Sequence, residues 1–189
     1  MRVVRRRILA FLIPAALLAA GVVRAHDSLY HYIEVRPGGE TALEVTFSIH
    51  AADLASARAL GADPAGNDLA WLQGRSESEI AALLADARAF VTGTFSLGIE
   101  GAPLDLAEAL RFPAPSLLAA DPAANEAARP GFLEATIVLP AGTRALSVVH
   151  AAGSGKRLLL VLNRPGAFPI VRDLAPGDSA PVTLTSDTP

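Results

Sequence analysis

Hydrophobic and polar residues alternate strictly over residues 29–36 and again over 43–50. A period of two is typical of half-buried strands. Because Pro37, Gly38 and Gly39 separate the two runs, we expect a hairpin with its loop over 37–39. One face of this hairpin is apolar apart from a single histidine, and it comprises Leu29, His31, Ile33, Val35, Leu43, Val45, Phe47 and Ile49.

The register of the hairpin is predicted from its loop. With residues 37–39 as the loop, Tyr30 faces Thr46 and the apolar side chains share one face. A slip of one residue would mix the two faces. Extending the same ladder places His26 across from His50, where facing Cβ atoms are about 5 Å apart.

Helical periodicity follows the hairpin. Residues 53–60 predict a short helix that Gly61 and Pro64 end. Residues 76–90 give the stronger signal, because Ser76 and Glu79 match a capping box. Apolar residues then recur on one face at helical spacing, namely Ile80, Leu83, Leu84, Ala87, Phe90 and Val91.

Short strands dominate from residue 94 onward, and we expect them at 95–100, 104–112, 132–139, 144–151, 157–162, 168–172 and 182–185. The proline-rich stretch 113–130 predicts a long loop. Residues 153–156 contain Gly-Ser-Gly-Lys but lack the full spacing of a phosphate-binding loop, so we interpret them as a hairpin turn. Together these patterns predict a mainly β fold, an immunoglobulin-like β-sandwich with a helical insertion after the second strand.

The first 25 residues have the pattern of a signal peptide. Arginines precede an apolar run over 8–23, and Val23 and Ala25 supply the small residues of a cleavage site. The run is shorter than the about 20 residues of a membrane-spanning helix. We expect a signal peptide at 1–25, a single domain at 26–185 and a frayed tail at 186–189. The protein would then be periplasmic or secreted, without a transmembrane segment, and retention of the leader as an anchor is the alternative.

Removal of the leader changes the charge of the chain. The leader holds five of the 16 basic residues and none of the 19 acidic ones, so the remainder has a formal charge of −8. A negative field of this kind disfavours nucleic acid and favours cations. The chain has no cysteine, which excludes disulfides and thiolate chemistry.

Cleavage after Ala25 would give His26 a free α-amine beside its own imidazole. With the imidazole of His50 alongside, three nitrogens could bind Cu(II) or Ni(II). Asp27 and Asp53 could add a carboxylate or orient an imidazole. In the alternative interpretation the ladder ends before His26, and neither histidine binds a metal.

The other two histidines are weaker candidates. His31 lies on the apolar face, which favours a core position. His150 ends a predicted strand and could be a distant third ligand, although nothing in the sequence brings it near His26. The chain has no nucleophile elbow around Ser154, and its acidic pairs are typical of a helix start and of solvated strands. We therefore expect a non-enzymatic protein.

Five short motifs carry a family resemblance: Ala25-His26-Asp27, residues 29–36, His50-Ala51-Ala52-Asp53-Leu54, residues 90–97 and Gly101-Ala102-Pro103-Leu104. In this order they resemble the extracytoplasmic N-terminal domain of HupE/UreJ-type proteins, which are membrane proteins associated with hydrogenase and urease accessory functions. The resemblance covers most of residues 25–185. It implies a periplasmic β-sandwich linked to nickel, copper or cobalt handling. Those proteins continue into several membrane helices, which the 189 residues of this sequence do not include after the domain. The resemblance therefore implies a free-standing version of the soluble domain and does not extend to transport.

The leading hypothesis is a periplasmic domain that binds or relays Cu or Ni through His26 and His50. It would act as an accessory to metal uptake, with a membrane transporter as its partner. One alternative is a metal-free interaction module that docks on a membrane partner through its helix or residues 113–130. Another is a copper redox protein with a terminal histidine brace, which needs a third nitrogen donor near His26.

Overall fold

Nine strands form two sheets in the computed structural model, which describes residues 30–38, 42–62, 68–122, 130–140 and 142–184. The larger sheet has the order β5-β2-β1-β7-β8, and its strands are β1 (Tyr30–Pro37), β2 (Ala42–His50), β5 (Phe132–Pro140), β7 (Arg157–Leu162) and β8 (Ile170–Leu174). The smaller sheet has the order β4-β3-β6-β9, and its strands are β3 (Phe95–Ile99), β4 (Ala102–Leu104), β6 (Ala145–His150) and β9 (Ser179–Thr183). The pairing of β1 with β7 is parallel, and the other strand pairs are antiparallel.

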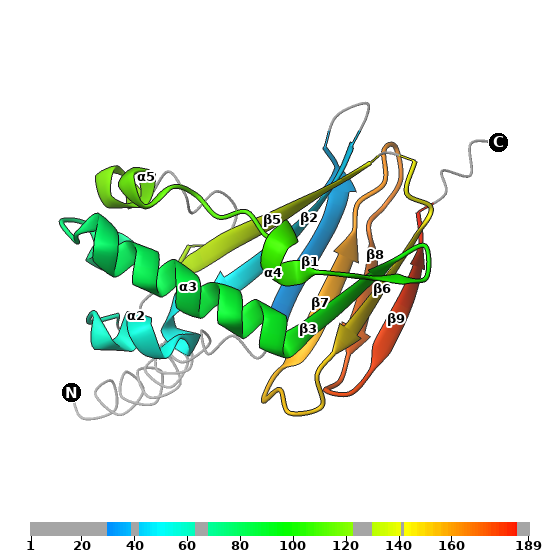
Figure 1. Cartoon of the computed structure of the whole chain (residues 1–189). Coiled ribbons are helices and arrows are strands. Elements are labelled where there is room, and N and C mark those ends of the chain that lie inside the picture. Colours follow the sequence, from blue (N-terminus) through cyan, green and yellow to red (C-terminus); the bar gives the residue numbers. More distant parts are fainter. Residues whose placement is uncertain (1–29, 39–41, 63–67, 123–129, 141, 185–189) are drawn as a thin grey trace, which may run out of the picture.

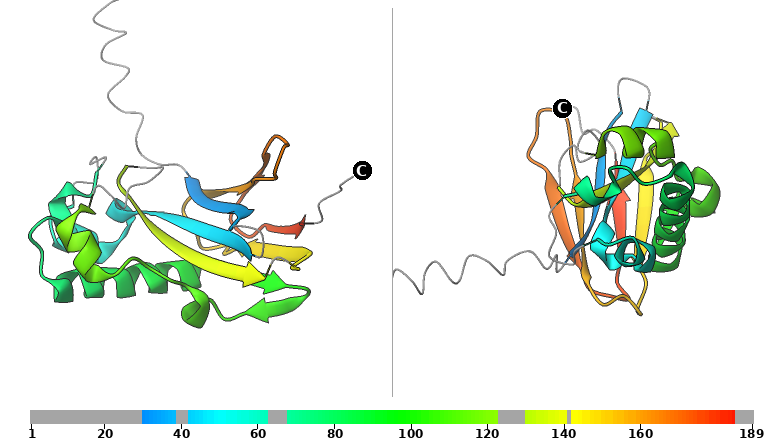
Figure 2. Two further views of the ribbon diagram at one scale, coloured as in Figure 1. Left: turned by 90° about the horizontal axis from the view of Figure 1, so that it is seen from above. Right: turned by 90° about the vertical axis from the view of Figure 1, so that its left-hand side faces the viewer.

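The helices lie on the same side of the larger sheet as the smaller sheet does. Figure 1 shows α3 (Glu77–Thr94) crossing in front of β5 and β2 and leading directly into β3. Figure 2 shows the same arrangement from above and from one end. The remaining helical elements are the 3-10 turns η1 (Ala51–Asp53) and η2 (Ala70–Leu72) and the helices α2 (Ala55–Ala59), α4 (Leu106–Ala109) and α5 (Pro115–Ala120). The predicted mainly β sandwich with a helical insertion after the second strand is confirmed.

Alternation decides which side chains form the core. Ile33, Val35, Val45 and Phe47 point to the covered face of the larger sheet and are at most 2% exposed. Their neighbours along the strands point to the outer face, where Val138 remains 66% exposed. The two faces therefore offer side chains different surroundings.

The hairpin register differs from the predicted one. Glu34, not Tyr30, faces Thr46. The loop is longer than expected, and the Gly38 amide donates to the Ala42 carbonyl at 3.0 Å. The partner of each residue is displaced by four positions, an even number, so every side chain keeps its predicted face while its partner changes. Extended by two places, this register puts Tyr30 rather than His26 across from His50.

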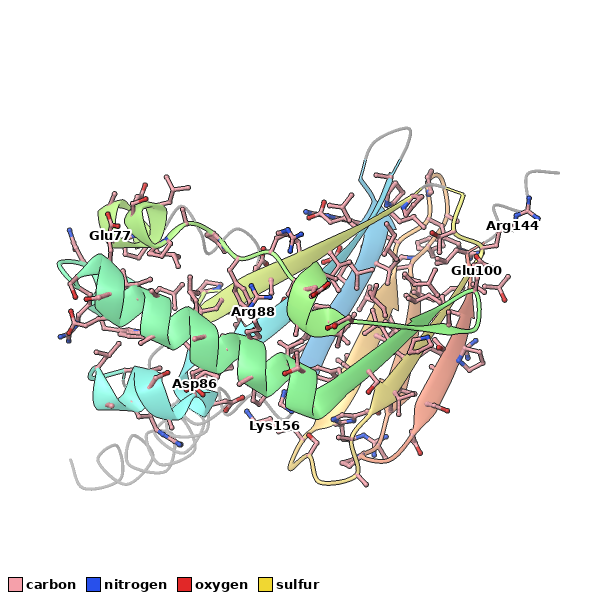
Figure 3. The ribbon with its side chains drawn as sticks, in the orientation of Figure 1. Glu77, Asp86, Arg88, Glu100, Arg144 and Lys156 are labelled. Carbon is pink, nitrogen blue, oxygen red and sulfur yellow. The ribbon has the colours of Figure 1, made fainter. Side chains whose placement is uncertain are left out.

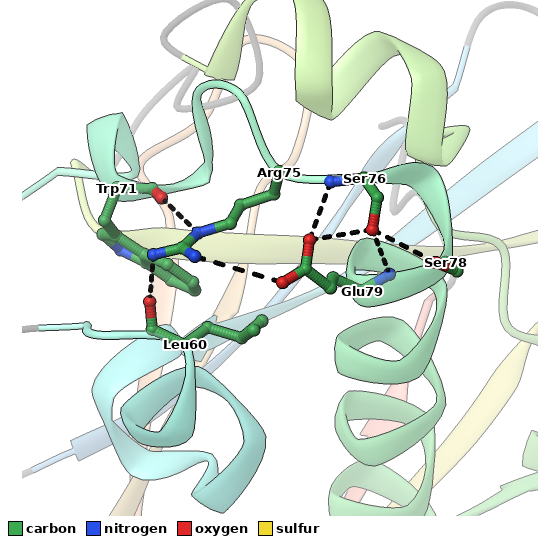
Figure 4. Close-up of polar contacts among 6 residues, drawn as sticks. All are labelled: Leu60, Trp71, Arg75, Ser76, Ser78 and Glu79. Atoms are coloured by element: carbon green, nitrogen blue, oxygen red, sulfur yellow. Dashed lines mark hydrogen bonds and ion pairs between the residues drawn. The ribbon is translucent and has the colours of Figure 1, made fainter.

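The start of α3 confirms the predicted capping box. Ser76 Oγ accepts from the Glu79 amide, while the Glu79 carboxylate accepts from the Ser76 amide at 2.8 Å. Arg75 joins this cap to the preceding segment by donating to the carbonyls of Leu60 and Trp71, as Figure 4 shows. These bonds fix the direction of α3 relative to the segment that precedes it.

Three further sequence-based expectations are wrong. The predicted strand at 104–112 ends at Leu104, because Asp105 accepts from the Ala107 amide at 2.9 Å and starts α4. The expected loop at 113–130 contains α5, which has Pro115 in its first turn, where a missing amide is tolerated. Residues 153–156 do not close a hairpin, because they connect β6 in the smaller sheet to β7 in the larger one.

Candidate functional site

Three histidines gather where the chain enters β1, and the fourth, His26, lies outside the described residues. His31 is near the start of β1 and points to the covered face. His150 ends β6 and points inward from the smaller sheet. His50 ends β2, and its register places it on the outer face of the larger sheet.

His50 is held beside a carboxylate. Its imidazole is 7% exposed and its ring centroid lies 5.1 Å from that of Phe132. The 3-10 turn after β2 returns the chain so that Asp53 Oδ1 comes to 3.7 Å from His50 Nδ1. Because Nδ1 faces this carboxylate, Nε2 is the ring nitrogen that could bind a metal. A carboxylate on the second nitrogen is a common feature of metal-binding histidines.

Asp53 also binds the only lysine of the chain. Lys156 Nζ lies 2.8 Å from each carboxylate oxygen of Asp53, and both side chains are about one-fifth exposed. Burial raises the pKa of Asp53, but the neighbouring His50 and the hydrogen-bonded Lys156 together outweigh burial and hold that pKa below its usual value. Asp53 is therefore an ionised carboxylate shared between an imidazole and an ammonium group.

His31 and His150 form a separate pair inside the sandwich. Their ring centroids are 5.8 Å apart in an edge-to-face arrangement. His31 Nε2 lies 3.1 Å from Ser154 Oγ. Burial lowers the pKa of His31 to about 4; Asp53 opposes the shift, while Lys156 and His150 add to it. His31 is therefore neutral at pH 7, and its predicted core position is confirmed.

His150 is fully buried, and neither of its ring nitrogens has a hydrogen-bond partner among the described residues. Burial lowers its pKa. The backbone of Ala175 and Leu174 opposes this shift without making a hydrogen bond of good geometry. His150 contacts His31 on the covered side of the larger sheet. His50 lies on the opposite, outer face of that sheet.

Within the described ranges, no group of three His, Cys, Asp or Glu side chains is placed to hold a metal ion. A site of three or more ligands at His50 therefore needs a donor from outside these ranges, and His26 is the predicted one. No helix of the described segments is long and apolar enough to cross a bilayer.

The sequence interpretation missed Ser154 and Lys156. Both lie in the segment read as a hairpin turn, whereas the real connection between the sheets carries them to His31 and Asp53. The signal that could have indicated a role is that Lys156 is the only lysine of the chain.

No known protein family, curated protein or solved structure matches this chain. The site is therefore defined by its own residues alone, and the HupE/UreJ resemblance stays a prediction.

Proposed function

We propose that this chain is an exported, non-enzymatic domain that binds Cu(II) or Ni(II) through His26 and His50 and relays it to a membrane transporter. The observation that supports this most directly is the contact of His50 Nδ1 with Asp53 at 3.7 Å. With Nδ1 facing Asp53, Nε2 of His50 is the ring nitrogen that would ligate the metal, and the carboxylate would hold the ring in place.

The second ligand would come from the new N-terminus. Four Cα steps separate His26 from Tyr30, and they span at most about 14 Å when fully extended. A continued β-strand would carry His26 four residues beyond the partner of His50. The proposal therefore requires residues 27–29 to turn back toward the end of β2.

Lys156 limits how tightly such a site would hold a metal. Its ammonium group occupies both oxygens of Asp53, so this carboxylate orients His50 and does not serve as a further ligand. Two imidazoles and one amine would leave coordination positions open. An incompletely filled coordination sphere suits transfer to a partner better than storage.

The experiment is isothermal titration of untagged protein that begins at His26 with Cu(II) and with Ni(II). We expect binding at micromolar or tighter affinity, weakened at least about tenfold by His50→Ala. A variant with one extra alanine before His26 should weaken binding similarly, because it moves the α-amine away from the imidazole. His150→Phe is the control and should bind as the parent does.

Two results would contradict the proposal. One is the absence of binding tighter than about micromolar, and the other is equal binding by the double variant His26→Ala/His50→Ala. The first result would favour the metal-free interaction module, and the second would mean that the metal binds elsewhere on the chain. The intact mass of the exported protein tests separately whether cleavage occurs after Ala25.

A further inference from the structure

A groove lies on the helical side of the molecule, between α3 and the segment that connects α4 to the start of α5. Its volume is about 410 Å³, and its lining includes apolar side chains such as Leu84, Leu110 and Phe112. Two arginines, Arg88 and Arg111, also line it. The groove is therefore apolar with a cationic part.

Arg88 is fixed at this groove. Its Nη1 donates to the carbonyls of Ala107, at 2.6 Å, and Leu110, at 3.1 Å. Its guanidinium carbon lies 5.3 Å from the ring centroid of Phe112, within the range of a cation–π contact. Nε and Nη2 make no hydrogen bond with the residues described, so these donors remain for a ligand. In Figure 3, Arg88 lies on the side of α3 that faces α4 and α5.

Arg111 is fixed beside it. Its amide and carbonyl pair with those of Thr136 on β5, both at 2.8 Å. Its Nη1 donates to the carbonyls of Glu108 and Leu110. The Nη1 atoms of both arginines lie 3.1 Å from the Leu110 oxygen, so they are separated by at most about twice that distance. Two guanidinium groups are thus held close together although they repel each other.

Neither arginine has a carboxylate partner within the described ranges. By contrast, Arg36, Arg75 and Arg157 form ion pairs at 3.0, 4.0 and 2.7 Å. Glu108 offers its carbonyl to Arg111, and its carboxylate forms no ion pair with either arginine. Two unpaired cations that share one acceptor and border an apolar groove favour an anionic ligand.

We infer that this groove binds a small amphiphilic monoanion, a carboxylate with a short apolar chain. The carboxylate would bridge the free donors of Arg88 and Arg111, and the chain would lie along Ala81, Ala85, Phe112 and Pro115, which line the groove and are at least partly exposed. The volume lies within the range of small-molecule sites. An inorganic anion would leave the apolar lining exposed to water, so the groove should prefer the amphiphile.

The test is titration of the protein with octanoate in the presence of EDTA, which keeps it independent of metal binding. Inorganic phosphate and octylamine are the comparison ligands. We expect saturable binding of octanoate, with neither comparison ligand binding comparably. Arg111→Gln should weaken octanoate binding at least tenfold. Arg88→Lys keeps the charge but loses the fork of donors, so it should also weaken binding.

Arg144→Gln is the matched control, because Arg144 lies at the far end of the molecule from the groove in Figure 3. It removes the same charge and should leave octanoate binding unchanged. The inference is overturned by non-saturable binding, by equal weakening in Arg111→Gln and Arg144→Gln, or by phosphate binding as tightly as octanoate. A thermal melt of each variant shows that the folded protein is being compared.

Discussion

Histidines on the two faces of the larger sheet have nearly the same exposure, both pack against aromatic rings, and they differ in their polar neighbours. His31 is 6% exposed and His50 is 7% exposed. His31 lies among the rings of Phe90, Phe95 and His150. His50 lies beside the Asp53 carboxylate. Burial alone therefore does not separate a structural histidine from a candidate ligand, whereas the neighbouring group does.

The difference has a physical cause. An imidazole in an apolar environment loses the stabilisation that water gives its charged form, so it stays neutral and packs like an aromatic ring. A carboxylate on one ring nitrogen instead orients the ring and raises the basicity of the other nitrogen. Only the second arrangement prepares a side chain to bind a metal ion.

The largest expected effect is a loss of stability in acid. The pKa of His31 is about 4 in the folded protein, below the 6.5 of an unfolded chain. The unfolded state therefore takes up a proton first as the pH falls. The full contribution is present above about pH 6.5, and up to about 3 kcal/mol of the free energy of unfolding is lost as the pH falls to 4. Urea unfolding followed by the fluorescence of Trp71 measures this loss.

The groups that face His31 make this test specific. Asp53 opposes the shift, whereas Lys156 and His150 strengthen it. The pKa of Asp53 is itself below its usual value, so its contribution is lost only at more acidic pH. His31→Leu should reduce the slope of stability against pH between 6.5 and 4. An unchanged slope in this variant would contradict the assignment.

The next effect concerns the carboxylate that distinguishes His50. Lys156→Met removes the ammonium group from Asp53, and we expect the free energy of unfolding to fall by about 1 to 2 kcal/mol. Cu(II) binding should become tighter at the same time, because Asp53 is then free to act as a ligand. Opposite changes in stability and metal affinity are not expected from general damage to the fold.

Arg157→Met is the matched control for this change. The ion pair of Arg157 with Asp173 has both side chains nearly half exposed, so its loss should cost less than about 1 kcal/mol. It should leave Cu(II) binding unchanged. Weaker Cu(II) binding by Lys156→Met would mean that the ammonium group helps to position Asp53 and does not compete for it.

Features that depend on local periodicity could be predicted from the sequence. Alternation placed Ile33 and Phe47 on the buried face, and the capping box placed the start of α3. The register could not be predicted in the same way, because displacing the partners by four residues preserves every face. The helix at Leu106–Ala109 was missed because the side chain of Asp105 satisfies its first amides, which the hydrophobic pattern does not report.

The contacts of the candidate site also divide into local ones, which the sequence could indicate, and long-range ones, which it could not. His50 and Asp53 are three residues apart, so the sequence could indicate their contact. His31 and His150 meet only because the two sheets pack face to face, and no local pattern carries that information. Lys156 reaches Asp53 through the connection between the sheets, so a wrong hairpin assignment was enough to hide it.

The smallest expected effect tests whether His150 is purely a packing residue. His150→Phe replaces two buried nitrogens that have no partner in the described structure with carbon atoms. Leaving such groups unpaired is costly, so we expect the free energy of unfolding to rise by between zero and about 1 kcal/mol, with the larger ring limiting the gain. His31→Phe should instead destabilise, because it loses the contact with Ser154. If thermal or urea unfolding shows that His150→Phe costs as much as His31→Phe, which adds the same larger ring, then the imidazole of His150 also has a polar partner, and it is not purely a packing residue.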